Sequence, residues 1–382
     1  MSHTQTNTSP WLAWLSMASV VFLAIVSELL PSGLLTQMSQ GLNASPAQIG
    51  NLVGLNSLPA GILAIPVTQL VAKYNRKYIL MGASLLFALA NLILSQSQTY
   101  ALTVIARLIS GSAAGLFWPL IASYASRTVA PEHSGRAVTI VLSGSTIGLS
   151  LGLPLFTWLG QMLGWRVAFL LVAGLFLTLA VLGYFTFMSV PGEVQGDRLP
   201  LGSFFKNRGI QVALQVVVLL VMAQYSTYVY MQLITARTGN QLQVAQIIFG
   251  LGAILAVTLV ARYIDKYLRY LFIAAFSLGI LAMLSFLSGQ TFLTYFGMFA
   301  WGMSYGPISS LLQNLTMGQV KQGKDVAASI QTFAFDFSIM AASLFGGFIL
   351  EKIGLQANLS LAIVLFAIGL VIVNLQSRFF KR

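Results

Sequence analysis

Glu28 is the residue whose type and position most clearly suggest chemistry. It lies in Ser27-Glu28-Leu29-Leu30-Pro31-Ser32-Gly33, inside an apolar run over residues 11–38 that is long enough to cross a lipid bilayer. A charge at that depth costs about 3 kcal/mol, so the carboxylate should face protein or a water-filled cavity. Pro31 has no backbone N–H and frees the carbonyl of Ser27, which loosens the helix beside the acid. We interpret Glu28 as a protonatable group in a transport path; the alternative is a fixed partner of a buried arginine.

Arg107 and Asp336 are the other charged side chains well inside apolar segments. Counting helical turns places Glu28 about 12–15 Å and Arg107 about 12 Å from the same side of the membrane, so the two could form a pair. The proton affinity of a carboxylate depends on its distance from a guanidinium, so a movement that separates them would couple protons to transport. A purely structural ion pair is the alternative.

Asp336 lies about 20 Å into its apolar segment from the cytoplasmic side. It is expected to be a second titrating or substrate-binding acid, or a residue bonded to the facing helix. With Glu28 and Arg107 it makes up the expected proton-coupling set.

Polar and aromatic side chains could line a substrate cavity, because aromatic faces suit sugar rings and drug-like rings alike. The candidates are Asn56, Gln224, Tyr225, Tyr228, Trp301, Tyr305 and Gln313. Tyr228 and Tyr230 point to different faces of one helix, so at most one of the two is expected in the cavity. Aromatic residues near the ends of spans also mark the membrane interface, which is the alternative for each aromatic candidate.

The composition is that of an integral membrane protein. The chain is 57% hydrophobic and 7% charged, with a mean hydropathy of +0.84, whereas soluble domains carry about 25% charged residues. It has no cysteine, which excludes disulfides and thiolate metal sites. It has no G-x-x-x-x-G-K-[ST] motif, and its histidines, His3 and His133, lie outside the apolar segments. We therefore expect no enzyme, no metal and no cofactor, with a proton gradient as the source of energy.

The elements that must position these side chains are apolar segments separated by short polar breaks. We predict twelve helices, near residues 11–38, 45–71, 76–96, 99–127, 134–160, 165–188, 209–235, 242–264, 269–288, 291–318, 323–350 and 355–377. The longest polar interruption, residues 189–208, divides them six and six. The sequence thus predicts an all-α membrane protein with an N-terminal six-helix bundle (1–188), a cytoplasmic linker (189–208) and a C-terminal six-helix bundle (209–382).

Lys and Arg are unevenly distributed among the breaks. One alternating set of breaks, together with the C-terminal tail, holds sixteen of them, and the other set holds three, Arg166, Arg237 and Lys352. By the positive-inside rule, both termini and the linker are expected in the cytoplasm. The net charge of +12 therefore indicates topology, and no nucleic-acid partner is expected.

The two halves also repeat. Lys73-Tyr74-Asn75-Arg76 follows the second predicted helix, and Lys266-Tyr267-Leu268-Arg269 follows the eighth, at an offset of 193 residues in a chain of 382. Paired halves of this kind are the plan of transporters whose substrate site lies between the halves near the middle of the membrane.

Several motifs resemble those of major facilitators of the drug:proton antiporter type, close to bacterial sugar-efflux and arabinose-efflux permeases. The segment Glu28–Leu35 resembles the first-helix signature, Arg107–Gly115 the fourth-helix motif, and Gly160–Arg166 the turn after the fifth helix. The antiporter motif of the fifth helix is matched by Gly144, Gly148, Gly152 and Pro154. Its glycines are expected to pack against neighbouring helices first and to act as a flexible gate second.

The loop motif between the second and third helices departs from the family. Thr68 and Ala72 stand where the family carries Gly and Asp, and Asn75 replaces a second glycine. The first half therefore lacks the acid of a gating latch. The remaining gating candidates are Lys73, Arg76, Lys77 and, in the corresponding loop of the second half, Asp265.

The resemblance implies a proton-coupled secondary transporter in a bacterial inner membrane. It would export sugars, sugar-like compounds or drugs from the cytoplasm by alternating access. Its expected partners are a small-molecule substrate, protons and the lipid bilayer, with the chain acting as a monomer. Proton symport or uncoupled facilitation into the cell remains open, and a membrane-embedded sensor or enzyme is the alternative from another class.

Overall fold

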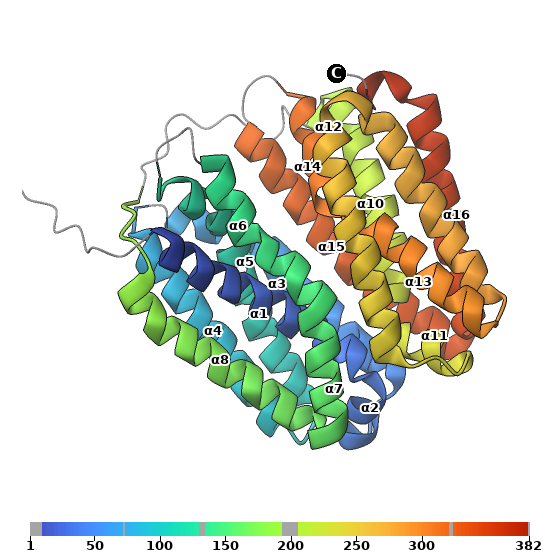
Figure 1. Cartoon of the computed structure of the whole chain (residues 1–382), viewed down its shortest axis with the longest axis horizontal. Helices are drawn as coiled ribbons and strands as arrows, with labels where there is room; N and C mark the ends of the chain where they lie inside the picture. Colours follow the sequence, from blue (N-terminus) through green and yellow to red (C-terminus); the bar gives the residue numbers. More distant parts are fainter. Residues whose placement is uncertain (1–9, 72, 130–133, 193–204, 321–323, 381–382) are drawn as a thin grey trace, which may run out of the picture.

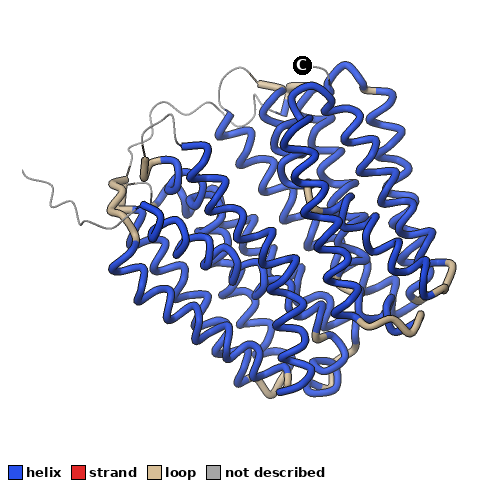
Figure 2. The backbone as a smooth tube through the Cα atoms, in the orientation of Figure 1, coloured by secondary structure: helices blue, strands red, loops and turns tan. Residues whose placement is uncertain are grey.

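The computed structural model describes residues 10–71, 73–129, 134–192, 205–320 and 324–380, which are helical along most of their length, without a β-strand (Figures 1 and 2). The first half contains α1 (Pro10–Gly33), α2 (Leu35–Leu42), α3 (Pro46–Leu70), α4 (Arg76–Gln96), α5 (Tyr100–Ser126), α6 (Ser134–Ile147), the π-helix η2 (Gly148–Gly152), α7 (Leu153–Leu163) and α8 (Trp165–Thr186). The second half contains α10 (Arg208–Tyr228), α11 (Met231–Arg237), α12 (Leu242–Leu287), α13 (Thr291–Tyr305), α14 (Ile308–Gly318), α15 (Lys324–Lys352), α16 (Leu355–Leu375) and the 3-10 helix η3 (Ser377–Phe380). Residues 193–204 of the predicted linker lie outside the described residues.

Local sequence signals set several helix ends. The side chains of Asn75, Thr99 and Asn207 accept hydrogen bonds from backbone N–H groups in the first turns of α4, α5 and α10, which satisfies donors that a helix start leaves unpaired. Gly164 and Gly354 adopt φ of 99° and 111° at the turns before α8 and α16, a conformation that glycine adopts without strain.

Four predicted helices are interrupted. Leu34 separates α1 from α2 just after Pro31, the π-turn η2 comes just before Pro154, and Pro307 separates α13 from α14. Proline lacks a backbone donor and clashes with the preceding turn, which explains these three breaks. The break between α10 and α11 has no proline.

The 46-residue helix α12 folds back on itself. Its length, about 70 Å at the rise of an α-helix, exceeds the membrane thickness, and Tyr267 within it has non-helical angles (φ −127°, ψ 28°). On α13, Gly302 lies against the carbonyl of Phe249 while Ser304 donates a hydrogen bond to the carbonyl of Ala275 (2.7 Å). Both arms of α12 therefore flank α13, and they correspond to the predicted helices 242–264 and 269–288.

The chain is a multi-pass membrane protein. Nine helical stretches among the described residues are long and apolar enough to cross a membrane. Large apolar side chains such as Leu85, Leu175 and Val371 remain exposed on the helices, as lipid contact requires and water contact disfavours. Because α3 and the α13–α14 pair fall outside those nine stretches, the count of twelve crossings remains a prediction.

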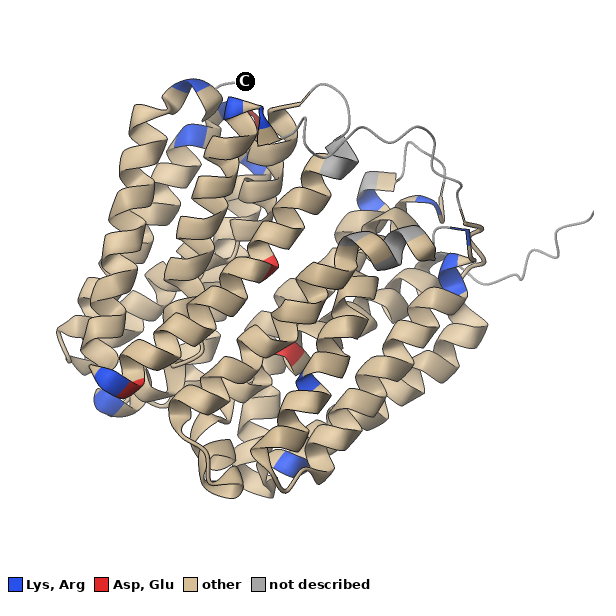
Figure 3. Ribbon diagram, turned by 180° about the vertical axis from the view of Figure 1, so that it is seen from behind, with Lys and Arg blue, Asp and Glu red and all other residues tan. Residues whose placement is uncertain are grey.

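Figure 1 shows the helices in two groups, with α1 to α8 largely on one side and α10 to α16 on the other. The short helices α2 and α11, with the end of α7, lie at the end of the molecule opposite to the C-terminus. Most Lys and Arg residues gather at the end that carries the C-terminus (Figure 3). We call this the basic end and the other the seam end.

Candidate functional site

Arg107 anchors the turn of α1 that carries Glu28. Its buried guanidinium donates from Nη1 to the carbonyl of Ser27 (2.9 Å), from Nη2 to the carbonyl of Glu28 (2.8 Å) and from Nε to the carbonyl of Leu52 (3.0 Å). The Ser27 carbonyl is the one that Pro31 leaves without its helical partner. One side chain on α5 therefore ties together α1 and α3 and fixes the position of Glu28.

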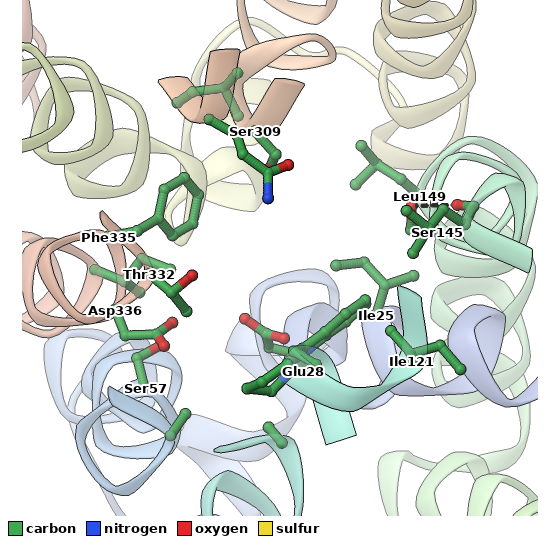
Figure 4. Close-up of a pocket in the computed structure, with 18 of the residues that line it drawn as sticks. Ile25, Glu28, Ser57, Ile121, Ser145, Leu149, Ser309, Thr332, Phe335 and Asp336 are labelled. Atoms are coloured by element: carbon green, nitrogen blue, oxygen red, sulfur yellow. Dashed lines mark hydrogen bonds between the residues drawn. The ribbon is translucent and has the colours of Figure 1, made fainter. Parts of the chain in front are cut away.

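This arrangement corrects the expected side-chain pair between Glu28 and Arg107. All three hydrogen bonds of the guanidinium end on backbone carbonyls, and the carboxylate is not among the acceptors. The physical reason is that the planar, five-donor guanidinium suits several diverging acceptors, and the proline supplies one of them. Arg107 still acts electrostatically on Glu28, whose side chain turns into a cavity (Figure 4).

A cavity of about 350 Å³ lies between the two halves. Its walls come from α1, α3, α5, α6 and η2 of the first half and from α10, α12, α13, α14 and α15 of the second. The carboxylates of Glu28 on α1 and Asp336 on α15 both point into it (Figure 4). No Lys, Arg or His is among the lining residues that the structure describes. The formal charge of the cavity is therefore negative only.

The expected substrate-binding residues divide into two groups. Four of them line the cavity: Asn56, Tyr225, Tyr305 and Gln313. The other three, Gln224, Tyr228 and Trp301, are almost fully buried behind its wall, which corrects their expected place in it.

The three buried residues bond to their own bundle. Trp301 donates through its indole N–H to the side-chain oxygen of Gln224 (2.5 Å), and Gln224 donates to the hydroxyl of Ser304 (2.7 Å). Tyr228 stacks on Tyr305 with 5.0 Å between ring centroids. Their polar atoms and rings thus fix the position of the cavity wall, as satisfied buried networks do.

Several lining residues were missed. Ser57 follows Asn56, Gln331 and Thr332 precede Asp336 by about one turn, and further lining residues are Trp118, Ser145, Thr146, Ser309 and Phe335. The four-residue spacing from Thr332 to Asp336 places both on one helix face and would have identified Thr332.

Direct contacts between the halves close the seam end. Thr36 on α2 donates its N–H to the side chain of Gln232 on α11 (3.1 Å), and Gln243 on α12 donates to Gln161 on α7. Further contacts join Gln246 to Thr157 (3.4 Å), Ser150 to the carbonyl of Gly250 (3.2 Å) and Ser343 to the carbonyl of Gly50 (3.3 Å). The cavity lining continues past these contacts towards the basic end, through Trp118, Ala122, Leu142, Gln331 and Gln313. The cavity is therefore reached from the basic end.

The family model described as Major Facilitator Superfamily matches residues 17–341. The chain belongs to the Major Facilitator Superfamily. It is accordingly a membrane transporter of small molecules and not an enzyme.

Relatives of this major facilitator are named for different substrates. It is 27% identical over 372 residues to a chloramphenicol efflux pump of Mycobacterium tuberculosis, with 91% of this chain and 89% of the relative covered. It is 25% identical over 368 residues to a probable sugar efflux transporter of Pasteurella multocida, with 94% and 90% covered. The crystal structure of the nucleoside transporter NupG has the same fold, with a TM-score of 0.76, 16% identity and coverage of 97% of this chain and 99% of that one.

The glycines and the proline of the fifth-helix motif lie where helices of this major facilitator meet. A Cβ on Gly144 would lie 2.1 Å from the carbonyl oxygen of Ala18, and one on Gly148 would lie 2.3 Å from a methyl carbon of Ile25. A Cβ on Gly152 would lie 2.6 Å from the ring of Phe22 and 2.7 Å from a methyl carbon of Val26. These glycines pack against α1, and Pro154 begins α7 after the π-turn that carries Gly148 and Gly152. Whether they also act as a gate remains a prediction.

The basic loop motif contacts its own half. Lys77 donates to the carbonyl of Tyr184 (2.6 Å), and the backbone N–H of Arg76 donates to the carbonyl of Val190 (2.8 Å). Asn75 caps α4, which explains why asparagine can stand at a family glycine position. Lys73 lies over the ring of Tyr74, and Asp265 lies on α12 close to its fold at Tyr267. A gating role for these residues is untested.

Proposed function

We propose that this chain exports a small organic molecule from the bacterial cytoplasm in exchange for protons, by alternating access. The observation that carries the proposal is the carboxylate of Glu28 in a cavity between the halves that is closed at the seam end. The efflux names of the relatives support the direction of transport. The basic end faces the cytoplasm by the positive-inside rule, which places both termini and the predicted linker there and gives an inward-open state.

Proton coupling follows from a change in the surroundings of Glu28. Arg107 holds α1 through its carbonyls, so the distance between guanidinium and carboxylate changes little when the halves move. The facing half does move, and with it the access of water to Glu28. The acid takes up a proton from the side with the higher proton concentration and gives it up when the cavity opens to the cytoplasm, where substrate enters. Asp336 belongs to the same cavity and is the second candidate for proton binding.

One chain supplies both walls of the cavity, which supports a monomer as the working unit. The polar wall formed by Asn56, Gln313, Tyr225 and Tyr305 offers hydrogen bonds and ring faces to a solute.

Uptake into inverted membrane vesicles tests the function. Chloramphenicol, arabinose and tryptamine are offered outside vesicles whose interior is acidic. At least one should accumulate, and a protonophore should abolish the accumulation. Accumulation that survives the protonophore would indicate facilitation, and accumulation driven only by an acidic exterior would indicate symport; either result contradicts proton antiport. Uptake of none of the three would contradict export of this range of solutes.

A further inference from the structure

The charged side chains that line the described part of the cavity are acids without a basic partner. Glu28 and Asp336 line it, and no basic side chain does so among the described residues. The cavity therefore offers negative charge to a solute that carries a positive one.

Asp336 is the less compensated of the two acids. Arg107 lies next to the Glu28 turn and acts on that carboxylate electrostatically. No cationic side chain lies beside Asp336 within the described part of the cavity. Part of the Asp336 surface is exposed to the cavity, so its carboxylate is accessible to a cation that enters, and no basic side chain among the described lining residues competes for it.

The opposite half makes room for Asp336. A Cβ on Gly61 of α3 would lie 3.1 Å from the Cβ of Asp336 and 3.9 Å from its Oδ2. One helical turn away on α3, Ser57 presents its hydroxyl towards the same carboxylate (Figure 4). Asp336 thus lies at the crossing of α3 and α15 and faces the cavity from there.

Aromatic rings lie beside these acceptors. Tyr225, Tyr305 and Phe335 line the cavity. The ring centroids of Tyr225 and Tyr305 are 5.5 Å apart, and those of Tyr225 and Phe335 are 6.2 Å apart with their planes nearly perpendicular. Aromatic faces attract cations and also pack against ring systems.

We propose that the transported solute is an organic cation, an amine attached to an aromatic ring, and that Asp336 binds its ammonium group. The inference rests on the proposed function and adds the substrate class. The ring of the solute packs against Tyr225, Tyr305 and Phe335. Neither chloramphenicol nor a sugar carries an ammonium group, so this preference distinguishes the chain from the relatives named for those substrates.

Matched amine and alcohol pairs test the proposal on the purified full-length protein by calorimetry at neutral pH. The pairs are 2-phenylethylamine with 2-phenylethanol, tryptamine with tryptophol, and 4-phenylbutylamine with 4-phenylbutanol, which differ within each pair in the charged group. At least one amine should bind about tenfold or more tightly than its alcohol, as expected for hydrogen bonds to a charged group. In Asp336→Asn the two should bind about equally.

Two further variants make the result specific. Glu351→Gln removes an acid from an exposed position of the same helix, outside the cavity, and should keep the amine preference. Gly61→Ala keeps the charge of Asp336 but displaces its side chain, and should weaken amine binding while leaving alcohol binding unchanged. This variant also serves as the test if Asp336→Asn does not fold.

Equal binding of amine and alcohol, no binding of any amine, or a preference that survives Asp336→Asn would overturn the proposal. Calorimetry needs no membrane gradient, so the result is separate from the transport assay. Gradient-driven export of neutral solutes without any amine preference would refute the cation site alone. Amine binding at Asp336 without gradient-driven movement would refute proton-coupled export and leave the cation site in place.

Discussion

The position of Arg107 depends on Pro31, a residue of α1. Pro31 leaves the carbonyl of Ser27 without a helical donor, and the Nη1 of Arg107 binds that carbonyl. The neighbouring carbonyl of Glu28 and the carbonyl of Leu52 take the other two hydrogen bonds. The arginine acts here as a structural clamp whose charge lies next to the acid that we propose couples protons.

Arg107→Ala should destabilise the protein more than the loss of any loop arginine. It would leave the carbonyl of Ser27 without a donor, at about 1–3 kcal/mol, and would remove the charged hydrogen bonds to the carbonyls of Glu28 and Leu52, at about 1.5–3 kcal/mol each. Together these losses correspond to a fall in the unfolding midpoint of about 5 °C or more. Thermal unfolding in detergent measures the difference. Arg208→Ala, at an exposed position at the start of α10, is the control and should have little effect. Equal midpoints for the two variants would refute the clamp.

Glu28→Gln should abolish gradient-driven accumulation in inverted vesicles while the protein stays folded. Glutamine has nearly the same shape but binds no proton in this range, and the Arg107 bonds use the backbone of residue 28 and so survive the change. Binding of the solute in detergent, measured alongside transport, shows that the variant is folded. Undiminished accumulation that still needs the gradient would exclude Glu28 as the coupling acid.

For individual residues, the sequence predicted which acids face the cavity but not which polar and aromatic side chains line it with them. Apolar surroundings made Glu28 and Asp336 conspicuous, and the cost of lipid contact predicted that both face inward. Gln224, Tyr228 and Trp301 had the same polar and aromatic character as true lining residues. Only the contacts between α10 and α13 show that Trp301 bonds to Gln224, that Gln224 bonds to Ser304 and that the ring of Tyr228 stacks on Tyr305.

Among the elements, α6, η2 and α7 form one interrupted helix of the first half, which packs against α1 of its own half and against α12 of the second half. Gly144 and Gly148 allow this helix to approach α1, and Ser150 in the π-turn donates a hydrogen bond to the carbonyl of Gly250 on α12. A Cβ on Gly250 would lie 2.6 Å from the Cα of Ser150. The π-turn therefore lies at a close contact between the two halves, and π-bulges are common at functional sites.

Gly144→Ala should destabilise the protein by about 1–3 kcal/mol, as overpacking of a close contact does. The added Cβ would meet the carbonyl oxygen of Ala18, which cannot move without separating α1 from α6. Gly174→Ala is the matched control, because a Cβ there on α8 meets nothing within 4 Å. The control should be neutral or stabilising by about 0.5–1 kcal/mol. Denaturation of both variants in detergent compares them, and similar stabilities would refute the close packing.

Element positions were predicted better than element continuity. The expected helix 76–96 coincides with α4, and 355–377 differs from α16 by two residues at its end. The interruption at Pro307 was missed, because a proline within an apolar segment can kink a helix without ending it. The joining of two expected helices into α12 was also missed, since a tight fold at Tyr267 leaves no long polar break.

The whole molecule is held in one state by contacts at the seam end. Five hydrogen bonds join residues of the first half to residues of the second there, from Thr36 and Gln232 to Ser343 and Gly50. Alternating access requires that these contacts break and that others form at the basic end. No cysteine is present in the chain, so pairs introduced at the seam have no competing thiols.

Linking Gln161→Cys to Gln243→Cys with a short bis-methanethiosulfonate should stop transport. The two glutamine side chains are hydrogen-bonded across the halves, so a linker would hold the seam closed and keep the cavity open to the basic end. A reducing agent should restore accumulation in inverted vesicles. Each single cysteine variant, treated in the same way, should transport as before. Transport that continues in the fully linked protein would exclude an opening at the seam.

The place of Gly61 beside Asp336 has a consequence for how the solute leaves. The acid belongs to one half, but the space that it occupies is left free by a glycine of the other. In the proposed export cycle the halves separate at the seam, so Gly61 moves away from Asp336 and the proposed ammonium site comes apart. High affinity for the solute then requires both halves to be in contact. The solute is released on the far side because the separation of the halves takes its binding site apart.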